Sequence, residues 1–291
     1  MHFTGTIWRP PFEAHSDLLQ VTVGCTHDKC KFCSLYEYRF SLSPMSEIEE
    51  DLQELSSYSS YAKRVFLTGA NPFALQVDKL KEIALMVKQY LPHVKSIGCF
   101  SRVTDITPKT LKQLNELRSL GYDAIIIGTE CGDNPTLEFM RKGYVSDDIV
   151  EQLNRLDEAG ITYHISYLNG LSGAGNSQRC ALSTAKIYNK ISPISINFVA
   201  LTVFAQSDLF GEIQNGSYTE TGELERLHEQ KTLIENLNIK TMIFANTISN
   251  TAPMVGKLPE DKEKLVKQLQ FAIDNISENE LRRYRNSIYH L

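Results

Sequence analysis

Short apolar runs alternate with amphipathic segments along most of this 291-residue chain, and this alternation is what most restricts its fold. Each run is followed by a segment in which apolar residues recur every three or four positions, as Ile48, Leu52 and Leu55 do, which is the pattern of a helix. Runs that are apolar throughout are typical of parallel strands covered by helices. The six runs occupy residues 18–23, 65–68, 94–100, 124–127, 161–168 and 194–204.

The fold class that this order predicts is α/β. Because crossovers between parallel strands are right-handed, six strand–helix units form a full or partial barrel or an open doubly wound sheet. Beyond residue 208 the pattern loosens to a helix over 223–237, a strand over 240–245 and a helix over 261–275. We therefore expect a core over residues 1–210 and a C-terminal extension over residues 211–291.

Composition excludes several classes of protein. The chain is 42% hydrophobic with 16 Gly and 10 Pro, which argues against a disordered or collagen-like chain. The N-terminus lacks the basic start and apolar stretch of a signal peptide. No apolar run approaches the roughly 18 residues that a membrane span needs. We expect a cytoplasmic protein with no membrane partner.

Charge argues against a nucleic-acid partner. The formal net charge is −5, and the 30 Lys and Arg residues are spread along the chain. Near the C-terminus Arg282, Arg283 and Arg285 form a small basic and aromatic group with Tyr284 and Tyr289. A solvated helix explains this small basic group better than a nucleic-acid patch does.

Three of the six cysteines lie within nine residues, in the spacing Cys25-x4-Cys30-x2-Cys33, directly after the first predicted strand. In parallel α/β folds the loops at the carboxyl ends of strands form the active face. Thiolates select zinc, copper(I) or iron–sulfur centres. Zinc would need a fourth ligand, and His27 lies too close to Cys25 to complete a tetrahedron without strain. An iron–sulfur cluster with three protein ligands, or three thiols without a metal, are the alternatives.

This loop, which spans residues 24–33 with the sequence GCTHDKCKFC, resembles the cluster loop of radical S-adenosylmethionine (SAM) enzymes. Most members space their cysteines x3 and x2, and the x4 gap here is that of a subgroup. Later motifs are similar to those of oxygen-independent coproporphyrinogen oxidases and methylthiotransferases. The resemblance covers roughly residues 4–275. It implies a partial (β/α)6 TIM-like barrel that the C-terminal extension closes, and a [4Fe–4S] cluster bound by Cys25, Cys30 and Cys33.

The resemblance also implies residues that bind SAM near the cluster loop. Phe32 matches the aromatic residue that packs beside the adenine. A loop after the second strand is similar to the Gly-Gly-Glu-Pro-like loop whose backbone carbonyls hold the methionine amino group, although an ordinary turn explains it equally well. That loop consists of Thr68, Gly69, Ala70 and Asn71.

Further SAM-binding residues follow the later strands. Glu130 would pair with an ammonium or a ribose hydroxyl, and Lys142, which its spacing favours over Arg141, would pair with the cofactor carboxylate. A surface ion pair is the alternative for Glu130 and Lys142. Ser166 matches a position that contacts the ribose. The remaining candidates are Leu35, Ser101, Arg102 and Ala200, and for Arg102 a surface salt bridge is an equal alternative.

The other three cysteines share no spacing. Cys99 lies in a predicted strand, and Cys180 lies in a predicted helix, where core packing is the expected role. Cys131 adjoins Glu130 on the expected active face. We name Cys131 as the candidate catalytic residue, because a thiol there could donate a hydrogen atom to a substrate radical.

The activity that the resemblance implies is that of an oxidoreductase-like or transferase-like enzyme. Reductive cleavage of SAM by the cluster would yield a 5′-deoxyadenosyl radical that abstracts hydrogen from a small or medium-sized substrate, which the sequence does not identify. A flavodoxin or ferredoxin would donate the electron. Asn246, Ser249 and Asn250 either face this substrate or form a plain loop. A non-catalytic iron–sulfur or zinc-binding protein is the alternative function.

Overall fold

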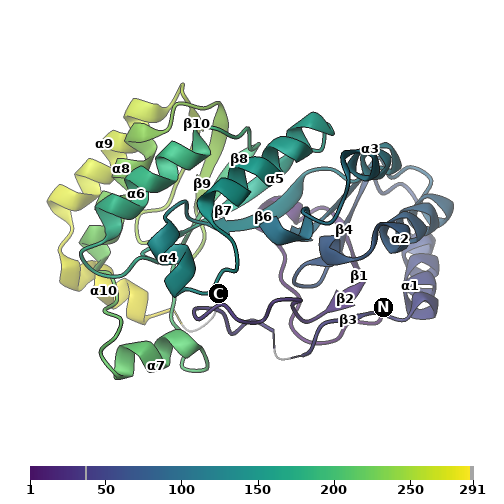
Figure 1. The fold of residues 1–291 in the computed structure, drawn as a ribbon, viewed down its shortest axis with the longest axis horizontal. Coiled ribbons are helices and arrows are strands. Elements are labelled where there is room, and N and C mark those ends of the chain that lie inside the picture. Colours follow the sequence, from purple (N-terminus) through teal and green to yellow (C-terminus); the bar gives the residue numbers. More distant parts are fainter. Residues whose placement is uncertain (37, 289–291) are drawn as a thin grey trace. The chain divides into compact units, whose positions relative to one another are not determined.

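The computed structural model describes residues 1–36 and 38–288, and its chain divides into two compact units (Figure 1). Unit 1 comprises Met1–Asp28, Cys33–Gly128 and Arg155–Tyr163, and unit 2 comprises Lys29–Phe32, Thr129–Asn154 and His164–Leu291. Neither unit is one continuous stretch of sequence. The division into a core over residues 1–210 and an extension over 211–291 stays a prediction.

The sheet of unit 1 is parallel, and its strands are hydrogen-bonded in sequence order. The register places Leu19 beside Leu67 and Leu67 beside Cys99, and all three are fully buried. A two-stranded hairpin follows the first strand of the sheet. The sheet strands are β1 (Asp17–Gln20), β4 (Arg64–Thr68), β5 (Ser96–Ser101) and β6 (Ile125–Glu130), and the hairpin consists of β2 (Thr22–Val23) and β3 (Ser41–Leu42).

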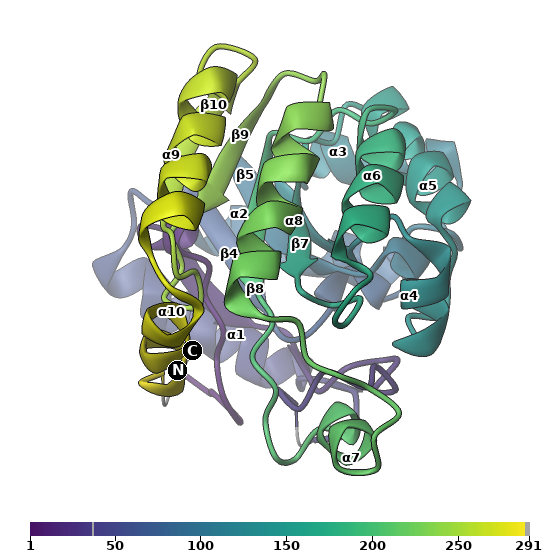
Figure 2. The ribbon, with the colours of Figure 1, turned by 90° about the vertical axis from the view of Figure 1, so that its left-hand side faces the viewer.

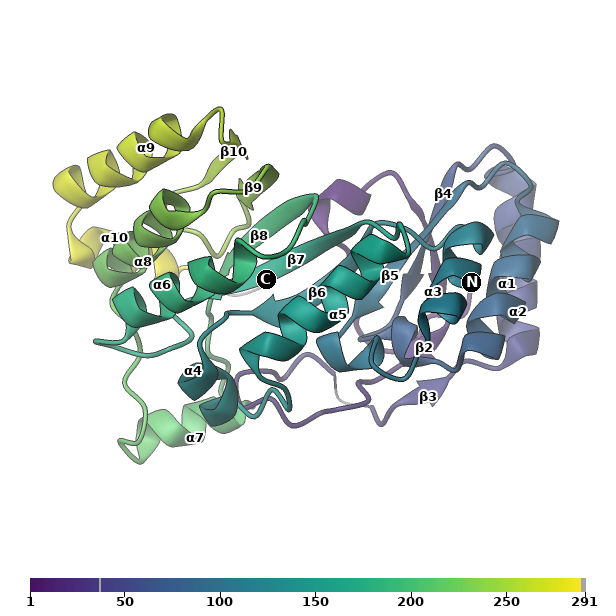
Figure 3. The same cartoon turned by 45° about the horizontal axis from the view of Figure 1, so that its top comes forward.

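Helices α1 (Met45–Tyr58), α2 (Val77–Tyr90) and α3 (Leu111–Leu120) cover the sheet of unit 1, and Figure 3 shows them next to one another. Each buries one apolar stripe, such as Ile48, Leu52 and Leu55 of α1. Gly121 ends α3 in the left-handed conformation (φ +109°), where a side chain would be strained. Short 3-10 helices are η1 (Pro11–Glu13), η2 (Pro72–Ala74) and η3 (Val103–Asp105).

The strands of unit 2 are β7 (Tyr163–Asn169), β8 (Ser195–Ala200), β9 (Thr241–Ala245) and β10 (Met254–Leu258). The first three are parallel, and β10 pairs antiparallel with β9. Figure 2 shows α6, α8 and α9 in a row beside these strands. The helices are α4 (Asn134–Phe139), α5 (Ser146–Glu158), α6 (Ser177–Tyr188), α7 (Asp208–Gln214), α8 (Glu223–Asn236), α9 (Lys262–Asn275) and α10 (Glu278–Asn286).

The predicted α/β class and the predicted order of strands and helices are confirmed. The predicted strand over 18–23 is two strands, because the chain leaves the sheet after Gln20 to form the hairpin. Among the elements that were not predicted, α4 and α7 are too short to show a helical period, β3 has only two residues, and β10 has alternate residues exposed. In the described part of the chain, no helix has the length and apolarity to cross a membrane.

The C-terminal basic group is helical, as expected, but it is not wholly solvated. α10 carries Arg282, Arg283 and Arg285, and Arg285 is only 7% exposed. Its guanidinium donates to both carboxylate oxygens of the fully buried Glu223, from Nε at 2.7 Å and from Nη2 at 3.0 Å. The expectation of a solvated helix is therefore wrong for Arg285, and Tyr289 lies outside the described residues.

Candidate functional site

The cysteine loop leaves the hairpin at Gly24. Its φ is +71°, and a Cβ atom there would lie 2.2 Å from the carbonyl oxygen of Tyr38, so only glycine fits. Cys25 then forms an isolated parallel bridge with Arg39. Burial, and then the nearby thiol groups of Cys33 and Cys25 in their charged form, raise the pKa of Tyr36 well above its usual range.

Residues 29–32 pack within unit 2. The backbone N–H of Lys31 donates to the carbonyl oxygen of Met140 at 3.2 Å, and the carbonyl oxygen of Lys31 accepts from Leu209 N–H at 2.7 Å. The Lys31 ammonium lies 4.0 Å from the ring centroid of Phe139 and donates to Glu212 at 2.5 Å. The segment that contains Cys30 and Phe32 is thus tied to the end of α4 and the start of α7.

At the carboxyl end of β4, the chain passes very close to the hairpin. Gly69 has φ +127°, and a Cβ atom there would lie 2.0 Å from the hydroxyl oxygen of Thr22. The bare backbone at Gly69 is therefore required by packing. The hydroxyl groups of Thr22 and Thr68 are buried, and neither has a hydrogen-bond partner within the described residues.

Asn71 is fully buried, and its side chain contacts the cysteine loop. Its Oδ1 accepts from Thr26 N–H at 3.2 Å, and its Nδ2 donates to Thr26 Oγ1 at 2.6 Å. The same Nδ2 donates to Asp105 Oδ2 at 3.0 Å, and this oxygen also accepts from Arg102 N–H at 2.7 Å. A chain of hydrogen bonds therefore joins the residue after Cys25 to the loops that follow β4 and β5.

Ser101 and Arg102 stand at the carboxyl end of β5, as predicted. Ser101 is 4% exposed and donates to the carbonyl oxygen of Arg102 at 2.9 Å. The guanidinium of Arg102 donates to Thr104 Oγ1 at 2.8 Å. Both residues are thereby held in the loop that contains Asp105.

Four of the predicted SAM-binding residues lie together in unit 2. Glu130 ends β6 and accepts from the Lys142 ammonium at 3.1 Å (Oε1) and from the Ser166 hydroxyl at 3.0 Å (Oε2). The Lys142 nitrogen also lies 5.5 Å from the ring centroids of Phe32 and of Tyr144. An ion pair, a hydroxyl group and two aromatic rings therefore form one cluster, which we call the Glu130 cluster.

The Glu130–Lys142 pair is not a surface ion pair. The side chains of Lys142 and Glu130 are only 5% and 14% exposed. Glu130 has φ +60°, a conformation that is uncommon outside glycine and is often found where a side chain must point at a site. Arg141, the alternative to Lys142, extends instead to Asp208 with 56% of its side chain exposed.

The two remaining candidates occupy less informative positions. Leu35 is half-buried in the cysteine loop. Ala200 ends β8 and is 2% exposed, and its N–H donates to the Ser249 hydroxyl at 3.2 Å. Ser249 and Asn250 are themselves buried, and Asn250 donates to the carbonyl oxygen of Phe198 at 2.8 Å. These contacts are those of a structural loop.

Cys131, Cys99 and Cys180 are all fully buried. Cys180 lies on the inner side of α6, which confirms its expected place in the core. A hydrogen bond with Cys131, and then burial, raise the pKa of the Cys180 thiol well above its usual range. Cys131 therefore packs against another thiol inside unit 2, and its role as a hydrogen-atom donor stays a prediction.

Sequence reasoning missed three polar residues around Asn71, namely Thr26, Asp105 and Lys109. Asp105 and Lys109 are 6% and 2% exposed, and burial raises the pKa of Asp105. The Lys109 ammonium donates to the carbonyl oxygens of Phe73 at 2.6 Å and Asp105 at 2.8 Å. The available signal was a carboxylate and a lysine four residues apart, directly after a strand end.

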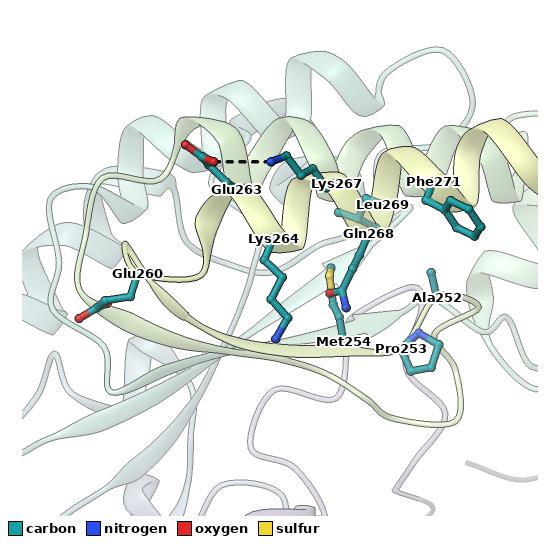
Figure 4. Close-up of a pocket in the computed structure, with 10 residues that line it drawn as sticks. All are labelled: Ala252, Pro253, Met254, Glu260, Glu263, Lys264, Lys267, Gln268, Leu269 and Phe271. Carbon is teal, nitrogen blue, oxygen red and sulfur yellow. Dashed lines mark ion pairs between the residues drawn. The ribbon is translucent and has the colours of Figure 1, made fainter.

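A pocket of about 670 Å³ lies in the C-terminal part of unit 2, far along the sequence from the cysteine loop and from the predicted SAM-binding residues. It is formed by Ala252, Pro253 and Met254 together with α9, from which Lys264 and Gln268 reach toward β10 (Figure 4). The charges around it are mixed, since Glu263 and Lys267 pair at 3.7 Å. None of the residues that line this pocket is a predicted cluster ligand or a predicted SAM-binding residue.

The cysteine loop fits an iron–sulfur cluster by its chemistry. Cys25, Cys30 and Cys33 are partly exposed and form no disulfide, and thiolates are the ligands that such clusters use. The unpaired hydroxyls of Thr22 and Thr68 also fit a site where a polar ligand group is taken up. Among residues 1–36 and 38–288, no three His, Cys, Asp or Glu side chains are grouped closely enough to hold a metal ion, so the ligand set stays a prediction.

Comparison with known protein families gives one match. The model described as "Radical SAM superfamily" matches residues 19–177, which is more than half of the chain. No curated protein matches the chain.

Several solved structures share the fold. The radical SAM methyltransferase TsrM from Kitasatospora setae, with cobalamin and a [4Fe–4S] cluster bound, has a TM-score of 0.57 at 15% identity, over 69% of this chain and 37% of its own. Methylornithine synthase (PylB) has a TM-score of 0.52 at 15% identity, and the match covers 92% of this chain and 85% of PylB. Coproporphyrinogen III oxidase (HemN) from Escherichia coli has a TM-score of 0.50 at 13% identity, and the match covers 69% of this chain and 51% of HemN.

At these identities the likeness shows the fold, which is the partial TIM-like barrel expected from the sequence. The chain spans less than two fifths of the length of TsrM.

Proposed function

The chain belongs to the radical SAM superfamily, and from this premise we propose that it cleaves SAM reductively and that the resulting radical abstracts hydrogen from a small or medium-sized substrate. Members of the superfamily are enzymes whose cofactors are a [4Fe–4S] cluster and SAM, and these are the cofactors of this chain. Cys25, Cys30 and Cys33 are the proposed cluster ligands. A flavodoxin or ferredoxin in the cytoplasm is the proposed electron donor.

The observation that supports this function best is the Glu130 cluster. Its ion pair, serine hydroxyl and aromatic ring come from three segments of unit 2, and all were expected to bind SAM. Together they supply a cation for a carboxylate, a carboxylate for a ribose hydroxyl or an ammonium, and an apolar face for an adenine.

A cluster bound by Cys25, Cys30 and Cys33 would supply the single electron that the reductive cleavage of SAM requires. The protein's residues orient the reactant. Lys142, fixed by Glu130, would bind the SAM carboxylate, and Phe32 would pack on its adenine. Ser166 holds the second oxygen of Glu130, so the carboxylate is fixed from both sides before SAM arrives.

An assay of 5′-deoxyadenosine tests the function. The protein would be reconstituted anaerobically with iron and sulfide, reduced with dithionite and incubated with SAM, and the product measured by chromatography. We expect wild type to bind about four iron atoms per chain and to form 5′-deoxyadenosine. Cys30→Ala should abolish both, because two thiolates remain.

Cys180→Ala is the matched control, since Cys180 is a buried cysteine outside the loop. It should keep the iron and the product. Zinc without a brown chromophore in the purified wild type would contradict the proposal and favour a zinc-binding protein. Equal iron in both cysteine variants would refute the ligand assignment.

A further inference from the structure

We infer that the side chain of Asn71 is a positioning group for the cysteine loop. Its side chain, together with Asp105, fixes Thr26 and thereby the neighbouring Cys25. The inference rests on the proposed function, because it takes Cys25 as a cluster ligand.

The hydrogen bonds of Asn71 leave its side chain no donor for a ligand. A primary amide has two N–H donors, and the two acceptors of Nδ2 are Thr26 Oγ1 at 2.6 Å and Asp105 Oδ2 at 3.0 Å. Its Oδ1 already accepts from Thr26 N–H at 3.2 Å. Because Asn71 is fully buried, each of these bonds matters: a lost partner would leave a buried polar group unpaired.

Asn71 is also not an ordinary turn residue. It stands at the N-cap position of η2, where an asparagine side chain would accept from the backbone of its own helix. No such bond is formed here. The side chain instead crosses to Thr26, which lies 45 residues earlier in the chain.

The far end of this chain of hydrogen bonds is held firmly. Asp105 accepts from Arg102 N–H at 2.7 Å, which fixes its carboxylate in η3. Lys109 donates to the carbonyl oxygens of both Phe73 and Asp105, so it joins the loop of Asn71 to the loop of Asp105. The guanidinium of Arg155 also donates to the carbonyl oxygen of Lys109. Thr26 is therefore attached to a rigid support.

A reciprocal exchange of the two side chains tests the inference. Asn71→Asp places two carboxylates next to each other without a donor between them, and it should release the loop. Asp105→Asn alone should have little effect, because an amide oxygen can accept the same two bonds. The double variant N71D/D105N restores a donor between the two positions, but the donating Nδ2 of the amide at position 105 then takes the place of the oxygen that accepts from Arg102 N–H, so the restoration is partial.

The measurement is the rate at which reconstituted protein loses iron to a chelator under anaerobic conditions, with the thermal midpoint of each apo-protein recorded in parallel. We expect Asn71→Asp to lose iron roughly 10-fold to 100-fold faster than wild type, which is the usual effect of removing a residue that orients a metal ligand. The double variant should lose iron more slowly than Asn71→Asp, because only one carboxylate remains, and faster than wild type, because the bond from Arg102 N–H is lost. Asn115→Asp, an exposed asparagine on α3, is the matched control and should behave as wild type.

Each outcome bears on one claim. Wild type that takes up no iron–sulfur cluster refutes the proposed function. Wild type that holds a cluster, with Asn71→Asp releasing iron at the same rate, refutes the positioning role alone. A double variant that loses iron as fast as Asn71→Asp also overturns the inference, because the effect would then not act through Asp105.

Discussion

At the scale of single residues, Lys109 is a buried lysine, and its burial lowers its pKa from 10.5 to about 8. The groups facing it are Asp105 and Cys99, and both favour its charged form. Between about pH 8 and pH 10.5 the unfolded chain holds a proton at this residue that the folded chain does not. The free energy of unfolding therefore rises with pH across this window, by at most about 1.4 kcal/mol per pH unit from this group.

Lys109→Met should remove this rise. Urea unfolding of wild type and variant between pH 7 and pH 10 gives the difference in free energy at each pH. Above pH 8 we expect the free energy of unfolding of wild type to increase relative to that of Lys109→Met. Lys112→Met, at an exposed position of α3, should keep the wild-type slope, and equal slopes for all three proteins would contradict the lowered pKa.

At the scale of elements, α10 is joined to the start of α8 by buried charges. Glu278, at the start of α10, accepts from the N–H groups of Glu223 at 2.9 Å and Leu224 at 2.8 Å, which are otherwise unpaired at the first turn of α8. Arg285 binds Glu223 at two points, and Arg226 Nε lies 3.8 Å from the same carboxylate. Arg226 in turn donates to the carbonyl oxygens of Asn169, the last residue of β7, and of Leu201, the residue after β8. α10 therefore supports the carboxyl ends of two strands.

Arg285→Met should destabilise the protein by about 3 kcal/mol, because Glu223 would stay buried with only longer contacts to arginine. Urea unfolding followed by circular dichroism measures the loss. Arg283→Met, at an exposed position of the same helix, should change stability by less than about 0.5 kcal/mol. A similar loss of stability in both variants would mean that the helix propensity of α10, and not the Arg285–Glu223 ion pair, sets its contribution to stability.

At the scale of the whole molecule, a ligand that binds only the folded chain raises the unfolding temperature. SAM at about 100 times its dissociation constant should add about 2.7 kcal/mol, an increase of about 5 °C for a chain of this size. Calorimetry of the reconstituted protein with and without SAM measures this increase. Lys142→Met should keep the increase caused by the cluster and lose most of the increase caused by SAM.

Each variant is compared with its own SAM-free sample, so that the lost Glu130 pair does not enter the difference. Lys186→Met, at an exposed position of α6, is the control and should respond to SAM as wild type does. A full response in Lys142→Met would mean that Lys142 does not bind the SAM carboxylate.

Local patterns in the sequence were sufficient for the order of the elements. The three-to-four-residue period of α1, α2 and α8 and the apolar runs of β4 to β8 depend on neighbours along the chain, so they can be recognised without a structure. β10 could not be recognised in this way, because its stability comes from pairing with β9 and packing against α9. The cysteine loop indicated the family because its motif lies within one continuous stretch of sequence and can be recognised without a structure.

The sequence by itself thus determined the α/β class, the cysteine loop and the positions of the residues expected to bind SAM. Only the tertiary structure decided that Glu130 lies between Lys142 and Ser166, that Asn71 is bound to Thr26 and Asp105, and that Cys131 is buried beside Cys180. The physical reason is distance along the chain. These contacts join residues up to 49 positions apart, and which of the polar side chains at the strand ends meet depends on how the strands and loops pack, not on any local period.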